Sequence, residues 1–170
     1  YLTKTNISEV MDMNVENKEI IIVILDSGID TGCIELQGKI LQGYNFISDD
    51  SDIFDFLGHG TFLANIIGAN QNNNFGIAGI IEKVKLLPVK IINDNGVGTL
   101  ADLIDGIYYA VDNGAQIINI SSGMYFKSDI LEEAINYAVS KNVTIVASAG
   151  NNEVSEKMYP ASYEGVLSVT

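Results

Sequence analysis

Cysteine is nearly absent from this sequence: Cys33 is the only one among 170 residues, so no disulfide can form within the chain. Cytosolic proteins and exported bacterial proteins both tolerate a single cysteine, which leaves the cellular compartment open. Long apolar runs are missing too. Residues 20–25 form one of the longest, far short of the roughly 20 residues that a membrane-spanning helix needs, so we expect no membrane span. No secretory hydrophobic segment is present, and we attribute the initial Tyr1 to processing or trimming.

Positive charge is scarce. The sequence has nine Lys and Arg residues and 22 Asp and Glu residues, which gives a formal net charge of -13. Nucleic acid binding needs clustered cations against the phosphates, so we expect no nucleic acid partner. The simplest interpretation of the acidic surface is solubility, and the sharper alternative is a preference for basic substrates or a bound cation. A hydrophobic fraction of 47% and a charged fraction of 18% exclude a disordered chain and allow one domain with a real core.

The apolar pattern predicts strands that alternate with helices. The predicted strands are residues 19–25, 43–47, 84–91, 115–120, 143–147 and 166–169, and the predicted helices are residues 60–69, 99–112 and 128–140. Such alternation predicts an α/β fold of three layers, with a mostly parallel sheet and helices on both faces. Thr99 is the expected N-cap of the second helix, and residues 60–69 are apolar on most faces, which predicts a buried helix.

In a parallel α/β sheet, ligands bind beyond the carboxyl ends of the strands. The first strand ends in Asp26-Ser27-Gly28. An Asp that leaves a buried strand is well placed to stay ionised and to orient another group. Taken alone, it is equally compatible with a turn former, an N-cap or the phosphate-accepting Asp of a receiver domain.

His59, the only histidine, lies in Gly58-His59-Gly60-Thr61 at the start of a predicted helix. A single histidine is more often structural than catalytic. Here the flanking glycines leave the imidazole open to a substrate, and the helix start fixes its position. No other side chain in the sequence has an unperturbed pKa suited to act as a base at neutral pH.

Two further segments, residues 118–123 and 148–151, follow predicted strands, and each alone is compatible with a simple Gly-containing turn. Together, the four motifs resemble those of the subtilisin-like serine peptidases, the subtilases. The matching segments are Asp26-Ser27-Gly28-Ile29-Asp30, His59-Gly60-Thr61, Asn119-Ile120-Ser121-Ser122-Gly123 and Ala149-Gly150-Asn151. The resemblance covers residues 20–170 and depends on the order and spacing of the motifs, since no single motif is decisive.

The resemblance implies a serine endopeptidase in which Asp26 orients His59, His59 is the general base, and the Asn151 side chain stabilises the oxyanion. It also implies that residues 96–98 and 121–123 flank an extended substrate, and that residues 148–150, together with Met158, line the pocket for the substrate residue before the cleaved bond. Leu100 is expected near the pocket for a substrate residue further from that bond. These substrate-binding residues are Gly96, Val97, Gly98, Leu100, Ser121, Ser122, Gly123, Ser148, Ala149 and Gly150. The loop of residues 70–77 resembles the calcium loop of the family, with Glu35 and Asn73 as candidate calcium ligands.

The Gly-Thr-Ser-Met-Ala segment that carries the nucleophile in this family does not occur in the sequence. We therefore expect residues 1–170 to be the N-terminal portion of the peptidase domain, incomplete at the C-terminus and inactive alone. Its expected partners are a peptide or protein substrate and the remainder of the domain with the Ser. The alternative is an inactive binding or regulatory module. A receiver or phosphatase domain is disfavoured, because Lys90 lies inside its strand. The family is most often bacterial and exported, so we expect an extracellular or cell-surface location, with an intracellular one as the alternative.

Overall fold

The computed structural model describes residue 7 and residues 18–151 and 156–170. Six strands form one sheet: β1 (Ile20–Asp26), β2 (Tyr44–Asn45), β3 (Val84–Lys90), β4 (Ile117–Ile120), β5 (Thr144–Ser148) and β6 (Val166–Val169). Their order is β2-β3-β1-β4-β5-β6, and all neighbouring strands are parallel. The helices are α2 (His59–Gly68), α3 (Leu100–Asp112), α4 (Asp129–Ser140) and a short 3-10 helix, η1 (Ile34–Leu36).

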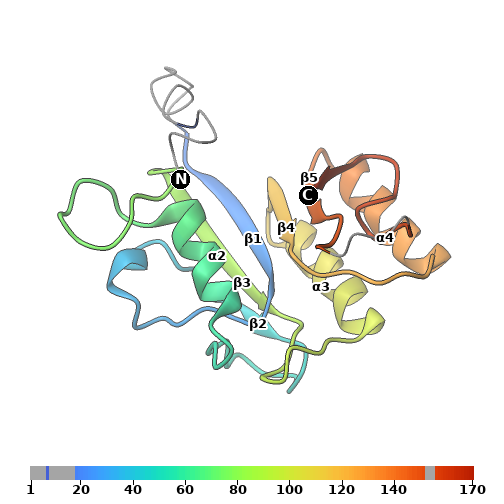
Figure 1. Ribbon diagram of the computed structural model, residues 1–170, viewed down its shortest axis with the longest axis horizontal. Coiled ribbons are helices and arrows are strands. Elements are labelled where there is room, and N and C mark those ends of the chain that lie inside the picture. The colour runs from blue at the N-terminus through green and yellow to red at the C-terminus, as the bar shows by residue number, and fades with distance from the viewer. Residues whose placement is uncertain (1–6, 8–17, 152–155) are drawn as a thin grey trace.

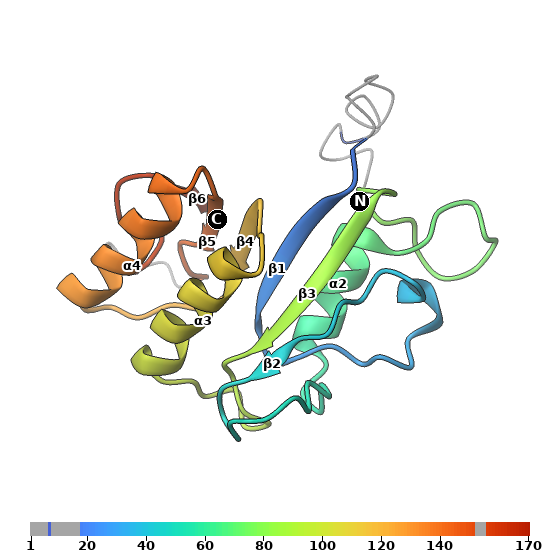
Figure 2. The same ribbon diagram turned by 180° about the vertical axis from the view of Figure 1, so that it is seen from behind.

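The helices cover both faces of the sheet, which confirms the predicted three-layer α/β fold. Helix α2 lies on one face in Figure 1, and the view from behind in Figure 2 shows α3 and α4 on the other. Strand β1 is apolar from Ile20 to Leu25 because both of its faces are covered. Successive side chains of a strand point to opposite faces, so Val23 and Leu25 pack in the cluster under α3 and α4, whereas Ile22 and Ile24 pack with α2.

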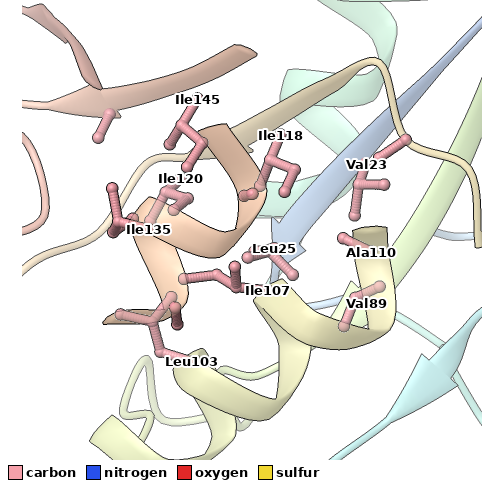
Figure 3. Packing of buried hydrophobic residues seen from close by; sticks show 14 of the residues in the cluster. Val23, Leu25, Val89, Leu103, Ile107, Ala110, Ile118, Ile120, Ile135 and Ile145 are labelled. Atoms are coloured by element: carbon pink, nitrogen blue, oxygen red, sulfur yellow. The ribbon is translucent and has the colours of Figure 1, made fainter. Parts of the chain in front are cut away.

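The larger core lies between the sheet and helices α3 and α4 (Figure 3). It includes Leu103 and Ile107 of α3, Ile135 of α4, and Ile118 and Ile145 of the sheet. Each of these two helices has an N-cap residue directly before its first turn.

Thr99, the predicted N-cap of α3, accepts a hydrogen bond from the Asp102 backbone N–H, and the Asp102 carboxylate accepts one from the Thr99 N–H. This reciprocal capping box was not part of the sequence prediction. Ser128 caps α4 by accepting from the Leu131 N–H. Both helices therefore begin where side-chain oxygens satisfy free backbone donors.

Helix α2 differs from its prediction, because it is not buried on most faces. Its buried residues are Gly60, Ala64 and Gly68, which are spaced four apart and face the sheet, whereas Phe62 is 61% exposed. Small residues at this spacing let the helix approach the sheet closely. A Cβ on Gly68 would lie only 2.7 Å from Cγ1 of Val84 in β3.

Strand β2 is shorter than the predicted strand of residues 43–47. The side chain of Asn45 accepts hydrogen bonds from the backbone N–H groups of Ile47 and Ser48, which turns the chain immediately after the strand. The other strands match their predictions to within two residues at each end. As expected, no helix within the described ranges is long and apolar enough to cross a membrane.

Candidate active site

Asp26 and His59 meet at the carboxyl end of β1. The Asp26 side chain is fully buried, and its Oδ1 lies 2.7 Å from Nδ1 of His59, whose side chain is 45% exposed. The same Oδ1 accepts hydrogen bonds from the backbone N–H and the hydroxyl of Ser27. An Nδ1–H that donates to a carboxylate leaves Nε2 of the imidazole free to accept a proton.

Glycine is required where the two segments dock. Gly28 has a φ of +108°, and a Cβ there would lie 2.3 Å from the carbonyl oxygen of Ile53. A Cβ on Gly60 would lie 2.1 Å from the carbonyl oxygen of Gly28. The Gly60 N–H donates to the Ser27 hydroxyl at 3.0 Å. The first turn of α2 is thus pressed against the turn that carries Asp26, and only glycine fits the contact.

Asp55 fixes the start of α2, although the sequence analysis did not single it out. The N-cap position is Gly58, which has no side chain to cap the helix. The Asp55 carboxylate takes over this function: Oδ1 accepts from the Gly58 N–H, and Oδ2 accepts from the backbone N–H and the hydroxyl of Thr61, all within 2.7–2.8 Å. Burial alone raises the pKa of Asp55, but the hydrogen bonds, mainly from Thr61, outweigh it and hold this pKa below its ordinary range.

Asn151 lies on the same cavity as His59. This cavity, of about 270 Å³, is open to solvent and is also lined by Ser121 and Ser148. Asn151 follows β5, and Ser121 follows β4, so the ends of neighbouring strands bring these polar groups together. The arrangement places a base and an amide donor around one space in which a carbonyl group could sit.

A second cavity, of about 250 Å³, lies between the segment that precedes α3 and the segment that follows β4. It is lined by residues 96–98 on one side and by Ser122 and Gly123 on the other. The structure therefore brings the two predicted substrate-binding segments together. Leu100 does not line this cavity; it begins α3 and packs against the main core.

Ser148 ends β5, Ala149 and Gly150 follow the strand, and Gly150 has a φ of +94°. The side chain of Met158 fills the space between this segment and Gly123. A Cβ on Gly123 would lie 2.9 Å from Met158 Cγ, and a Cβ on Gly150 would lie 2.9 Å from Met158 Sδ. Met158 therefore contacts both walls of the pocket that the sequence assigned to the substrate.

Comparison with known proteins decides the family. The model of the subtilase family matches residues 17–170. This chain belongs to the subtilase family. The thermophilic serine proteinase of Bacillus sp. (strain AK1) is 44% identical over 148 residues, and thermitase of Thermoactinomyces vulgaris is 38% identical over 148 residues. Each alignment covers 87% of this chain but only 37% of the first relative and 53% of the second, so the chain spans about half the length of these relatives or less.

The subtilase fold is also found in a solved structure. Fervidolysin from Fervidobacterium pennivorans, a keratinolytic enzyme related to subtilisin, superposes with a TM-score of 0.82 at 31% identity. The match covers 94% of this chain and 26% of that chain. The order of elements described above is thus the subtilase fold over nearly all of this chain.

The predicted calcium ligands of this subtilase, Glu35 and Asn73, lie together. Glu35 is 5% exposed, and Nδ2 of Asn73 lies 3.4 and 3.3 Å from its two carboxylate oxygens. Gly76 approaches so closely that a Cβ there would lie 2.6 Å from Glu35 Oε1. Within the described ranges, no group of three or more His, Cys, Asp or Glu side chains could hold a metal ion. A cation here would therefore depend on the Glu35 carboxylate, the side-chain amide oxygen of Asn73 and backbone carbonyl groups. These are all oxygen ligands, which suit a hard cation.

Proposed function

We propose that the protein to which this chain belongs is a serine endopeptidase, with Asp26 and His59 as two members of its catalytic triad and the serine outside residues 1–170. The observation that carries this proposal is the 2.7 Å contact between the buried Asp26 carboxylate and Nδ1 of the exposed His59. A buried carboxylate that orients an exposed imidazole is the arrangement that activates a hydroxyl nucleophile.

The chemistry proceeds through His59 Nε2. This nitrogen accepts the proton of the serine hydroxyl as the oxygen attacks the carbonyl carbon of the substrate, and Asp26 stabilises the imidazolium that forms. His59 then gives the proton to the leaving amine when the peptide bond breaks. In the acylation step, the negative charge develops on the carbonyl oxygen, and the Asn151 side chain donates a hydrogen bond to it. Loss of such a donor costs about 3 kcal/mol of transition-state stabilisation.

The substrate binds as an extended peptide in the cavity between residues 96–98 and 121–123. Exposed backbone groups on both sides pair with an extended chain and give affinity without reading its sequence. Met158 narrows the adjoining pocket between Gly123 and Gly150, and thereby limits the size of the side chain that enters it. The substrate is accordingly a peptide or an unfolded protein segment.

A structural calcium ion is the second part of the proposal. Glu35 and Asn73 supply the side-chain ligands, and the loop of residues 70–77 supplies carbonyl groups. The hydrogen bonds that Asn73 Nδ2 donates to the buried Glu35 carboxylate are long, at 3.4 and 3.3 Å, so they compensate its burial only weakly, which supports a bound cation. Removal of calcium with EGTA is expected to lower the melting temperature of the wild-type protein, and Glu35→Gln is expected to abolish that difference. An equal effect of EGTA on both proteins would count against the site.

The test of the proposed activity uses the full-length protein and a fluorophosphonate probe, which reacts covalently with activated serines. We expect one labelled serine in the wild-type protein and none in His59→Ala. A folded full-length protein that is not labelled would overturn the peptidase assignment and favour the alternative, an inactive binding or regulatory module, which the missing Gly-Thr-Ser segment motivates. We further propose an extracellular or cell-surface location, which cell fractionation tests.

A further inference from the structure

Lys90 is a buried cation for which the proposed mechanism has no use. It ends β3, in register opposite Asp26 of β1, and its side chain is only 7% exposed. Its Nζ donates hydrogen bonds to the carbonyl oxygen of Ser27 at 2.9 Å, to the carbonyl oxygen of Phe54 at 3.0 Å and to Asp94 Oδ1 at 2.9 Å. An ammonium group has three donors, so all of them are used.

The first two acceptors belong to the segments that carry the catalytic pair. Ser27 directly follows Asp26, and its hydroxyl and N–H both donate to the Asp26 carboxylate. Phe54 directly precedes Asp55, which holds the first turn of the helix that begins at His59. Lys90 therefore links the backbone behind Asp26 to the backbone before His59.

The third acceptor belongs to the turn that leads into the substrate-binding segment. Asp94 lies in this turn, and the neighbouring Asn93 organises it: Asn93 Oδ1 accepts from the N–H groups of Asn95 and Val97, and the Asn93 N–H donates to the Val97 carbonyl. The Asp94 carboxylate is 55% exposed, so its position depends on the ammonium that it contacts. The path from Lys90 to residues 96–98 is thus short and hydrogen-bonded.

Resting on the proposed function, we propose that Lys90 is a positioning residue that couples the Asp26–His59 pair to the substrate-binding segment of residues 96–98. A buried ammonium is costly unless its donors are satisfied, and here the satisfying acceptors come from three separate segments. Removal of the ammonium leaves the Ser27 and Phe54 carbonyls without this partner and frees Asp94. Displacements of about 1 Å at a catalytic pair cost about 100-fold in rate.

The test compares two lysines of the same strand in the full-length protein. Lys90→Met removes the coupling, and Lys85→Met is the matched control, since Lys85 Nζ also donates to a backbone carbonyl, that of Gly38, but at the other end of β3. Fluorophosphonate titration counts the competent sites, and kcat is expressed per titrated site. We expect Lys90→Met to lower kcat per site by about 100-fold and Lys85→Met to leave it within twofold.

Asp94→Ala removes only the contact between Lys90 and the turn that leads into residues 96–98. This variant keeps the inference testable if Lys90→Met does not fold. We expect KM to rise by about fivefold with kcat per site unchanged, because the Asp94 carboxylate is 55% exposed and solvent weakens its contact with Lys90. A merely structural lysine would reduce the number of titrated sites while kcat and KM per site stay at wild-type values. That result, or an unchanged KM in Asp94→Ala, would overturn the inference. An unlabelled wild-type protein would instead refute the peptidase activity itself.

Discussion

The two faces of the sheet are held in different ways. Under α3 and α4, apolar side chains such as Ile107 and Ile135 form the larger core, and each helix is capped by a residue next to it in sequence. Under α2 the apolar cluster is smaller, and the segments are joined by buried polar groups, among them Asp55 and Lys90. Hydrogen bonds depend on direction as well as distance, so they restrict the relative positions of the groups that they join. We therefore expect the α3–α4 face to supply most of the stability, and the α2 face to set the geometry of the proposed catalytic pair.

The largest loss of activity is expected for Asp26→Asn in the full-length protein, a substitution on the α2 face of the sheet. Loss of the carboxylate removes the group that orients His59, so kcat is expected to fall about 10⁴-fold. Stability should change by no more than about 1 kcal/mol, since the Asn oxygen still accepts from Ser27 and Asp26 Oδ2 accepts no hydrogen bond from any described residue. Peptide hydrolysis and urea unfolding measure the two quantities. Normal activity would refute the role of Asp26.

Ile107→Ala is the opposite experiment on the α3–α4 face. Ile107 is fully buried, so its truncation leaves a cavity and is expected to cost about 2–5 kcal/mol of unfolding free energy. Activity per titrated site should change little, because Ile107 itself lines neither of the two cavities at the site. A fall in kcat per site comparable to that of a catalytic variant would show that the two faces are not separable.

Gly60→Ala probes the docking of α2 against the Asp26 turn. The added Cβ meets a backbone oxygen at 2.1 Å, so the helix start must move, and kcat/KM is expected to fall about 100-fold. Gly68→Ala in the same helix is the matched control, because its Cβ meets side-chain methyl groups of Val84 and Leu86 and no backbone atom among its three nearest neighbours. It should affect stability without changing kcat per site. Equal losses of activity in both variants would contradict the account.

The smallest effect is expected for Asp55→Asn. The folded pKa of Asp55 lies below its ordinary value of 3.8, so its stabilisation is present above that value and is lost as the pH falls through the folded pKa. Urea unfolding should show a loss of about 1 kcal/mol at pH 7 that shrinks below about pH 3.8. Asp52→Asn, an exposed neighbour, serves as the control. A deficit that is independent of pH would argue against the ionised cap.

The sequence predicted the fold well because the apolar pattern is local. The run of residues 20–25 indicates a strand covered on both faces, and the cap at Thr99 lies next to its helix. The polar contacts of the α2 face escaped prediction because they join distant residues. Lys90 was judged only by its place inside a strand, yet its partner Ser27 is 63 residues away. Asp55 has one local signal, an Asp just before a helix start, which is an ordinary N-cap pattern.

The central claim is that the fold holds His59 Nδ1 against a buried carboxylate. Proton NMR of the full-length protein tests it directly, because a proton shared with a carboxylate at 2.7 Å resonates far downfield of the backbone amides. We expect one such resonance in the wild-type protein, and its loss in both Asp26→Asn and His59→Ala. A folded wild-type protein without this resonance, or one whose resonance survives in Asp26→Asn, would contradict the claim.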